Sequence, residues 1–99
     1  MEKNAEEYWL SGDAKLQQNQ SEQAIADYTQ AIELDPNNAG VYFNRGVANE
    51  TLNQYGEAIK DYTQAIGIDP SNAVAYFNRG VAKENLNQFE EAIITYCLT

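Results

Sequence analysis

Small and apolar residues recur three and four positions apart along most of this chain, which is the spacing of amphipathic helices. Between residues 39 and 72 they form two blocks separated by the polar pair Asn53-Gln54. The first block contains Tyr42, Gly46, Ala48 and Leu52, and the second contains Tyr55, Ala58, Ile59, Tyr62, Ala65 and Ile66. The pattern predicts two helices joined by a short polar turn.

This pair of blocks occurs three times, at an interval of 34 residues. Residues 5–38 and 39–72 are identical at 17 of 34 positions, and residues 39–65 and 73–99 at 16 of 27, which is far too many for chance. A repeat of this length predicts a stack of helical hairpins. We expect an all-α fold of three antiparallel hairpins, with units 5–38, 39–72 and 73–99 in a single domain spanning residues 1–99.

Proline and glycine mark where these helices end and meet. Asp35-Pro36 and Asp69-Pro70 separate the units, because proline cannot continue the preceding helix, and the asparagines that follow are good N-caps. Gly12, Gly46 and Gly80 stand in the middle of predicted helices, where glycine costs about 1 kcal/mol relative to alanine. We therefore expect the partner helix to approach closely at each glycine.

The recurring residues resemble the tetratricopeptide repeat (TPR) family over nearly the whole chain. The matching positions of the second unit are Tyr42, Gly46, Ala58, Tyr62, Ala65 and Pro70, and the third unit follows the pattern as far as Tyr96. The resemblance implies an α-solenoid wound as a right-handed superhelix, whose concave face is lined mainly by the first helix of each unit. Such modules bind peptides or other proteins.

The resemblance also implies which side chains line the concave groove. They are Trp9, Asp13, Phe43, Asn44, Val47, Glu50, Phe77, Asn78, Val81 and Glu84. Asn44 and Asn78 correspond to asparagines that hold peptide main chain in several family members; the alternative is that they only solvate the groove. For Trp9, Phe43 and Phe77 the alternative to partner contact is packing between helices.

One TPR subclass binds the acidic tail of heat-shock chaperones through Lys, Asn, Asn, Lys and Arg. At those positions this chain has Trp9, Asp13, Asn44, Val74 and Asn78, so only Asn44 fits. We expect the groove to reject an acidic tail.

Fifteen acidic against six basic residues give a net charge of −9, which disfavours nucleic acid and anionic membrane surfaces as partners. A neutral, apolar or basic protein or peptide is the expected partner. The chain has no histidine, and its carboxylates match no metal-binding spacing, so we expect no enzyme activity, no metal and no cofactor. Without a long apolar run or a signal-peptide pattern, a cytoplasmic location is expected.

Four charged residues suggest contacts between units. Asp27 and Asp61 lie in the predicted second helices of units one and two, while Arg45 and Arg79 lie in the first helices of units two and three. We expect Asp27 to pair with Arg45 and Asp61 with Arg79. Pairing of Arg45 with Asp61 inside one unit is the competing geometry.

The last helix differs from its equivalents at three positions. Lys60, Thr63 and Gln64 of the second unit become Ile94, Cys97 and Leu98 in the third. An apolar stripe of this kind marks either an interaction site or the cut end of a longer repeat array. The sequence thus leaves two functions open. One is a protein-binding adaptor or scaffold that takes an extended peptide or a partner helix in its concave groove. The other is a self-assembling module, such as a homodimer, that associates through this helix.

Overall fold

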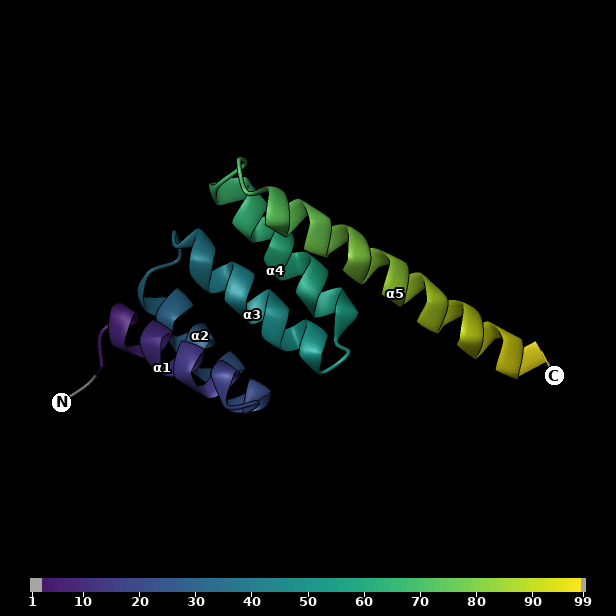
Figure 1. The fold of residues 1–99 in the computed structure, drawn as a ribbon, viewed down its shortest axis with the longest axis horizontal. Coiled ribbons are helices and arrows are strands. Elements are labelled where there is room, and N and C mark those ends of the chain that lie inside the picture. The colour runs from purple at the N-terminus through teal and green to yellow at the C-terminus, as the bar shows by residue number, and fades with distance from the viewer. Residues whose placement is uncertain (1–2, 99) are drawn as a thin grey trace.

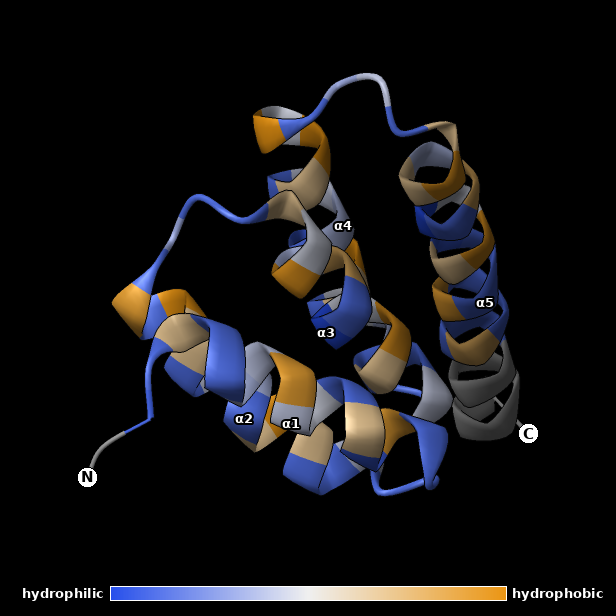
Figure 2. Ribbon diagram, turned by 60° about the vertical axis from the view of Figure 1, so that its left-hand side comes forward, coloured by the Kyte–Doolittle hydropathy of each residue, from blue (hydrophilic) through white to orange (hydrophobic). Residues whose placement is uncertain are grey.

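The computed structural model describes residues 3–98, and the side chains of residues 3–91 among them. The helices are α1 (Ala5–Gln17), α2 (Ser21–Leu34), α3 (Ala39–Thr51), α4 (Tyr55–Ile68) and α5 (Ala73–Leu98). Each helix packs against the next one along the chain, so that α2 contacts both α1 and α3, and α4 contacts both α3 and α5 (Figure 1). The connections are hydrophilic (Figure 2). This arrangement confirms the all-α solenoid.

The turns inside the first two hairpins are made by asparagine. Asn19 and Asn53 adopt left-handed backbone conformations, with φ angles of 61° and 60°. Asparagine tolerates this region better than other residues with a side chain, because its short amide bonds locally. The two turns end α1 and α3 and let α2 and α4 fold back antiparallel.

The boundaries between units are also as predicted. After the Asp-Pro pairs, Asn38 Oδ1 accepts a hydrogen bond from the Gly40 amide at 3.0 Å, and Asn72 Oδ1 accepts one from the Ala75 amide at 3.1 Å. Each asparagine thereby satisfies a backbone donor that the helix itself leaves unpaired. The two caps start α3 and α5.

Two buried tyrosines explain two of the mid-helix glycines. The rings of Tyr28 and Tyr62 are fully buried, one in each hairpin. A Cβ atom at Gly12 would lie 2.6 Å from Tyr28 Cε1, and one at Gly46 would lie 2.7 Å from Tyr62 Cε1. Only glycine leaves room for the ring, so the close approach expected at these residues is confirmed.

The third unit differs from the prediction, because it is one helix rather than a hairpin. Helix α5 runs without a break for 26 residues through Asn87-Gln88, where a turn was expected. Its second half projects away from the other helices (Figure 1). In consequence, among the described residues nothing outside the neighbouring α5 backbone lies within 4 Å of a Cβ placed on Gly80.

Local sequence favours the continued helix only weakly. At the place of Gly56 the third unit has Glu90, which suits a helix interior better, but unit one has Glu22 there and still forms a turn. Asn87 alone is too weak a helix breaker to force a turn. The unit also has Thr95 where Asp61 in unit two forms an ion pair across the hairpin, so a closed third hairpin would lack that interaction.

Among the described residues, no helix is long and apolar enough to cross a membrane.

Candidate functional site

A carboxylate on α1 joins three helices. Asp13 Oδ1 accepts a hydrogen bond from the Tyr28 hydroxyl of α2 at 2.5 Å and another from Asn44 Nδ2 of α3 at 2.9 Å. The contact from Asn44 links unit two to unit one. Three side chains from different helices therefore hold one another in a fixed geometry.

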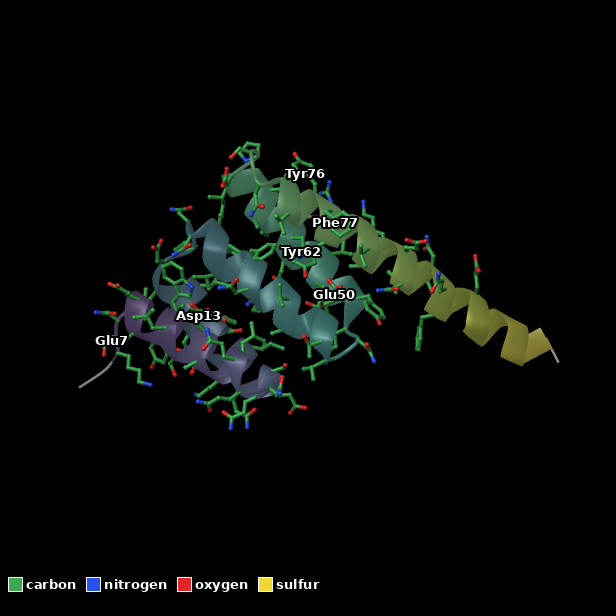
Figure 3. The ribbon with its side chains drawn as sticks, viewed as in Figure 1. Glu7, Asp13, Glu50, Tyr62, Tyr76 and Phe77 are labelled. Carbon is green, nitrogen blue, oxygen red and sulfur yellow. The ribbon has the colours of Figure 1, made fainter. Side chains whose placement is uncertain are left out.

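The second unit repeats this arrangement with a glutamate. The Tyr62 hydroxyl of α4 donates to Glu50 Oε1 of α3 at 2.8 Å (Figure 3). Val47, Glu50, Thr51, Tyr62 and, from the next unit, Asn78 line a cavity of about 210 Å³. In units one and two a buried tyrosine hydroxyl thus meets a carboxylate, with an asparagine of the following unit beside it. Five of the predicted groove residues, namely Asp13, Asn44, Val47, Glu50 and Asn78, belong to these two clusters.

The surroundings of the tyrosines keep their hydroxyls protonated. Burial raises the pKa of Tyr28 and of Tyr62 above the ordinary tyrosine range, and the neighbouring Asp13 and Glu50 raise these pKa values further. Each hydroxyl therefore acts as a donor, and the carboxylate opposite acts as an acceptor. The carboxylates of Asp13 and Glu50 are thus held in fixed orientations, and among the described side chains no lysine or arginine forms an ion pair with them.

Alkaline titration should reveal the two buried tyrosines. Because their pKa values are raised on folding, the folded state is stabilised at pH below about 10, the unfolded tyrosine pKa, and loses stability as pH rises above it. We expect ionisation of Tyr28 and Tyr62, read from absorbance near 295 nm, to coincide with loss of helical circular dichroism. The double variant Tyr28→Phe, Tyr62→Phe should lack this coincident phase. Because the chain has seven tyrosines, the signal of Tyr28 and Tyr62 is the difference between the parent protein and this variant. A tyrosinate difference signal that appears before any loss of helix would contradict the prediction.

The three aromatic residues of the groove have different surroundings. Trp9 packs against the cluster of Ala24, Tyr28, Ala31 and Val41, and Phe43 packs against Tyr62 with a centroid distance of 5.6 Å. The side chains of Trp9 and Phe43 therefore pack between helices, which is the alternative to partner contact. Phe77 is 71% exposed and lies on α5 near Tyr76 (Figure 3). Only this aromatic of the three offers most of its surface to a partner.

The remaining groove residues lie on α5. Val81 is half-buried and Glu84 is exposed. Glu84 adds a third carboxylate on the first helix of a unit, after Asp13 and Glu50.

The predicted ion pairs between units are wrong. Arg45 pairs with Asp61 of its own unit through Nη2–Oδ1 and Nε–Oδ2 contacts of 2.7 and 2.9 Å. Asp27 instead accepts from Lys15 Nζ at 2.7 Å and from Ser11 Oγ at 2.6 Å. The two helices of one hairpin face each other directly. A charged side chain on one helix therefore pairs with an opposite charge on the other helix of the same hairpin and not with one in the next unit.

These contacts set the charge states of the pairs. Burial by itself would raise the pKa of Asp27, but the hydrogen bonds from Lys15 and Ser11 outweigh it and lower that pKa below its usual value. Burial opposes the charged form of Arg45 as well, and Asp61 overcomes this and raises the arginine pKa. The ion pairs therefore persist over the physiological pH range.

The arginines still touch the preceding unit, although through threonine. Arg45 Nη1 donates to Thr29 Oγ1 at 3.2 Å, and Arg79 Nη1 donates to Thr63 Oγ1 at 3.4 Å. The sequence contained this signal, because threonine recurs at the same place in units one and two.

Two expectations concern the remaining surface. The side chains of Ile94, Cys97 and Leu98, which form the predicted stripe, lie outside the described residues. Within the part of the chain whose side chains are placed, no cluster of His, Cys, Asp or Glu could hold a metal ion.

Comparison with known protein families shows the family to which this chain belongs. The family model described as TPR repeat matches residues 12–53 and 51–87. The chain belongs to the tetratricopeptide repeat family. A search of the curated proteins finds no match for this TPR chain.

Solved TPR structures superpose closely on this chain. The TPR domain of Arabidopsis OM64 has a TM-score of 0.82 and 38% identity, over 89% of this chain and 73% of that one. The second TPR of Spaghetti (RPAP3), bound to the HSP90 peptide SRMEEVD, has a TM-score of 0.82 and 34% identity over 95% and 87% of the two chains. The TPR2B domain of yeast Sti1, in complex with an Hsp70 peptide, has a TM-score of 0.80 and 32% identity over 92% and 73%. The fold is that of a protein-interaction module.

One component of the groove was not predicted from the sequence. Tyr62 was predicted only as a residue of the repeat pattern, whereas the hydroxyls of Tyr28 and Tyr62 orient Asp13 and Glu50. The signal was the co-occurrence of tyrosine on each second helix with a carboxylate on the first.

Proposed function

We propose that this TPR chain is a binding module whose concave face takes an extended segment of a partner protein with neutral, apolar or basic character. The observation that carries the proposal is the pair of clusters in which Tyr28 orients Asp13 and Tyr62 orients Glu50. Two carboxylates held on rigid helices and lacking a cationic partner in the groove favour a ligand that brings hydrogen-bond donors or positive charge.

Amide and aromatic groups supply the rest of the recognition. The side-chain amide nitrogen of Asn44 donates to Asp13, which fixes the orientation of the Asn44 side chain. The side-chain oxygen of Asn44 can then accept a hydrogen bond from a peptide N–H. Asn78 borders the cavity beside Glu50. The exposed ring of Phe77 offers apolar contact at the α5 end of the same face. Main-chain contacts would supply affinity for an extended segment, and the carboxylates would set its charge preference.

We do not expect this chain to bind the chaperone peptides that are seen with its solved relatives. The SRMEEVD peptide seen with Spaghetti carries a run of acidic residues. This groove has carboxylates at Asp13, Glu50 and Glu84, and none of its predicted lining residues is lysine or arginine. Like charges facing each other disfavour such a complex.

A pair of peptides tests the charge preference directly. We expect the charge-reversed peptide SRMKKVK, with an amidated C-terminus, to bind at least about tenfold more tightly than SRMEEVD at low salt, a difference of about 1.4 kcal/mol. Binding can be followed by heteronuclear NMR shifts of the Asn44 and Asn78 side-chain amides. Glu50→Gln should reduce the preference, because it removes a charge but keeps the shape of the side chain.

The matched control for this test is Glu57→Gln, which removes an exposed carboxylate on α4 outside the predicted groove. It should leave the preference unchanged. Tighter binding of SRMEEVD, or equal effects of the two variants, would overturn the proposed charge preference.

Self-association through the stripe of Ile94, Cys97 and Leu98 is the second candidate function. The equivalent residues of unit two, Lys60, Thr63 and Gln64, are exposed. Apolar residues at exposed positions of this kind favour association. The variant Ile94→Lys, Leu98→Gln should abolish such association, as measured by sedimentation velocity across a hundredfold range of concentration. A wild-type chain that stays monomeric over the whole range would overturn this second function.

A further inference from the structure

The first half of α5 carries two positive charges on one side, although the chain as a whole is acidic. Arg79 and Lys83 are four residues apart, and Tyr76 and Gly80 lie within about 100° of them around the helix. Together these four residues form the cationic face of α5. Among the described side chains, neither Arg79 nor Lys83 forms an ion pair. Like charges at this spacing destabilise a helix, so the face favours a carboxylate between them.

In unit one the two equivalent positions hold a carboxylate of the second helix. Ser11 and Lys15, one helical turn apart on α1, donate to Asp27 Oδ2 at 2.6 and 2.7 Å. The carboxylate belongs to α2, and it is buried where the two helices face each other. These two positions of a first helix are therefore a binding site for a carboxylate of the helix that covers it.

Unit two repeats this site with other donors. Arg45 and Asn49 donate to Asp61 of α4 through three contacts of 2.7 to 3.0 Å. Arg79 and Lys83 occupy the same two positions in unit three, where both side chains are cationic. The third site therefore carries more positive charge than either of the others.

A space for an aromatic ring lies beside these charges. In units one and two the tyrosine that follows the aspartate packs over a glycine of the first helix, as Tyr62 packs over Gly46. Apart from the neighbouring α5 backbone, no described atom lies within 4 Å of a Cβ placed on Gly80. The adjacent Tyr76 ring is 45% exposed, although the Arg79 guanidinium stacks on it at 5.3 Å. The face can therefore accept a carboxylate and a ring from adjacent residues of one helix.

The last repeat of the chain does not provide these two groups together. Residues 88–98 align with residues 54–64, and Thr95 stands where units one and two have Asp27 and Asp61. A threonine hydroxyl carries no charge, so it would leave Arg79 and Lys83 without a counter-charge. Charge complementarity therefore points to a helix of another protein as the occupant.

We propose that the cationic face of α5 binds a helix of a partner protein that carries aspartate immediately before tyrosine, with a small residue four positions before the tyrosine. The carboxylate lies between Arg79 and Lys83, and the ring lies over Gly80. The small residue lets the two helices approach closely, as do Ala24 and Ala58, which are fully buried in their hairpins.

This surface is distinct from the two proposed above. None of its four residues belongs to the predicted lining of the concave groove, and none belongs to the stripe at residues 94, 97 and 98. The ligand also differs in charge, because the groove favours a neutral or basic segment and this face favours a carboxylate. Failure of either proposal therefore leaves the other intact.

A synthetic peptide with the sequence of residues 20–34 tests this proposal on the intact chain. It contains Ala24, Asp27 and Tyr28 at the required spacing, and it has no glycine. We expect the fluorescently labelled peptide to bind the wild type, as measured by anisotropy. The peptide variant Asp27→Asn should bind at least about tenfold more weakly, because it lacks the charge that the two cations attract. Added salt should weaken binding of the parent peptide more than that of this variant.

Variants of the chain locate the site of binding. Arg79→Gln with Lys83→Gln should weaken binding of the parent peptide at least about tenfold. The same double variant should hardly affect the Asp27→Asn peptide, because both changes remove one interaction. The matched control is Lys3→Gln with Lys60→Gln, which removes two exposed charges elsewhere and should leave the affinity unchanged.

The ring contact is tested separately. Gly80→Ala should weaken binding of the parent peptide at least about fivefold, because the added Cβ would meet the incoming ring as one at Gly46 would meet Tyr62. It should leave the affinity of a Tyr28→Ala peptide unchanged, since that peptide brings no ring. The backbone amide of Gly80 should also shift in heteronuclear NMR spectra when the parent peptide is added.

Three outcomes would overturn the proposal. One is equal affinity for the parent and Asp27→Asn peptides. Another is binding that Arg79→Gln with Lys83→Gln leaves unchanged, which would show that the peptide replaces α2 in unit one. The third is no binding at about 1 mM peptide, the result expected if a second copy or residues 88–98 of the same chain cover the face. Sedimentation velocity then distinguishes these two covers, and circular dichroism checks that each variant retains its helical content.

Discussion

Asp61→Ala is expected to lower the free energy of unfolding by about 3 kcal/mol, because it leaves the Arg45 guanidinium without its counter-charge in a largely buried place. The side chain of Asp61 is 5% exposed and that of Arg45 is 22% exposed. Asp61 also accepts a hydrogen bond from Asn49 Nδ2 at 3.0 Å. The substitution thus leaves three donor nitrogens unpaired between α3 and α4, two of Arg45 and one of Asn49. Urea denaturation followed by circular dichroism measures the change.

The equivalent aspartate of unit one supplies the control. Asp27 pairs with Lys15, whose side chain is 34% exposed and can turn toward water. We expect Asp27→Ala to cost about 1 kcal/mol, which is near the upper end for exposed pairs. The double variant Arg45→Met, Asp61→Leu should recover most of the loss caused by Asp61→Ala, because no unpaired charge remains. A cost for Asp61→Ala no larger than that for Asp27→Ala would contradict this account.

Gly46→Ala is expected to destabilise the protein by about 2 kcal/mol, the usual cost of overpacking a filled core. A Cβ at this residue would lie 2.7 Å from Tyr62 Cε1 and 2.9 Å from Tyr62 Cδ1. The ring is fully buried and its hydroxyl is held by Glu50, so it cannot move away without breaking that bond. Steric overlap therefore outweighs the gain of about 1 kcal/mol in helix propensity that alanine brings.

Gly67→Ala is the matched control on α4. No atom lies within 4 Å of a Cβ placed there, so only helix propensity acts and stability should rise by up to about 1 kcal/mol. The two glycine variants should thus change the urea midpoint in opposite directions. Changes in the same direction would show that the contact with Tyr62 does not explain why position 46 is glycine.

Local signals in the sequence predicted the parts of the fold that local chemistry decides. Pro36 and Pro70 end helices because proline breaks the hydrogen-bond ladder, and Asn38 and Asn72 begin the next ones by capping them. The helical blocks followed from the spacing of apolar residues. The repeat then supplied the stacking, since a hairpin that recurs in register can bury its apolar face only against its neighbours.

Local signals in the sequence could not predict which side chains pair with each other. Arg45 had two candidate carboxylates at equally regular positions, and Asp61 was chosen because α3 and α4 face each other within the hairpin. Phe43 and Phe77 occupy the same place in consecutive units, yet one packs on Tyr62 while the other is exposed. The difference depends on whether a second helix covers the site.

The sequence by itself determined the helical repeat, the ends of α1 to α4 and the acidic character of the groove, because these depend on residues close together in the chain or on composition. Only the tertiary structure decided the path of α5 and the partners of the charged and aromatic side chains. Asn87 occupies the same place in its unit as Asn19 and Asn53, which form turns, yet α5 continues through it. A turn breaks helical hydrogen bonds. It therefore forms only where packing of the two helices against each other stabilises the chain more than a continued helix would.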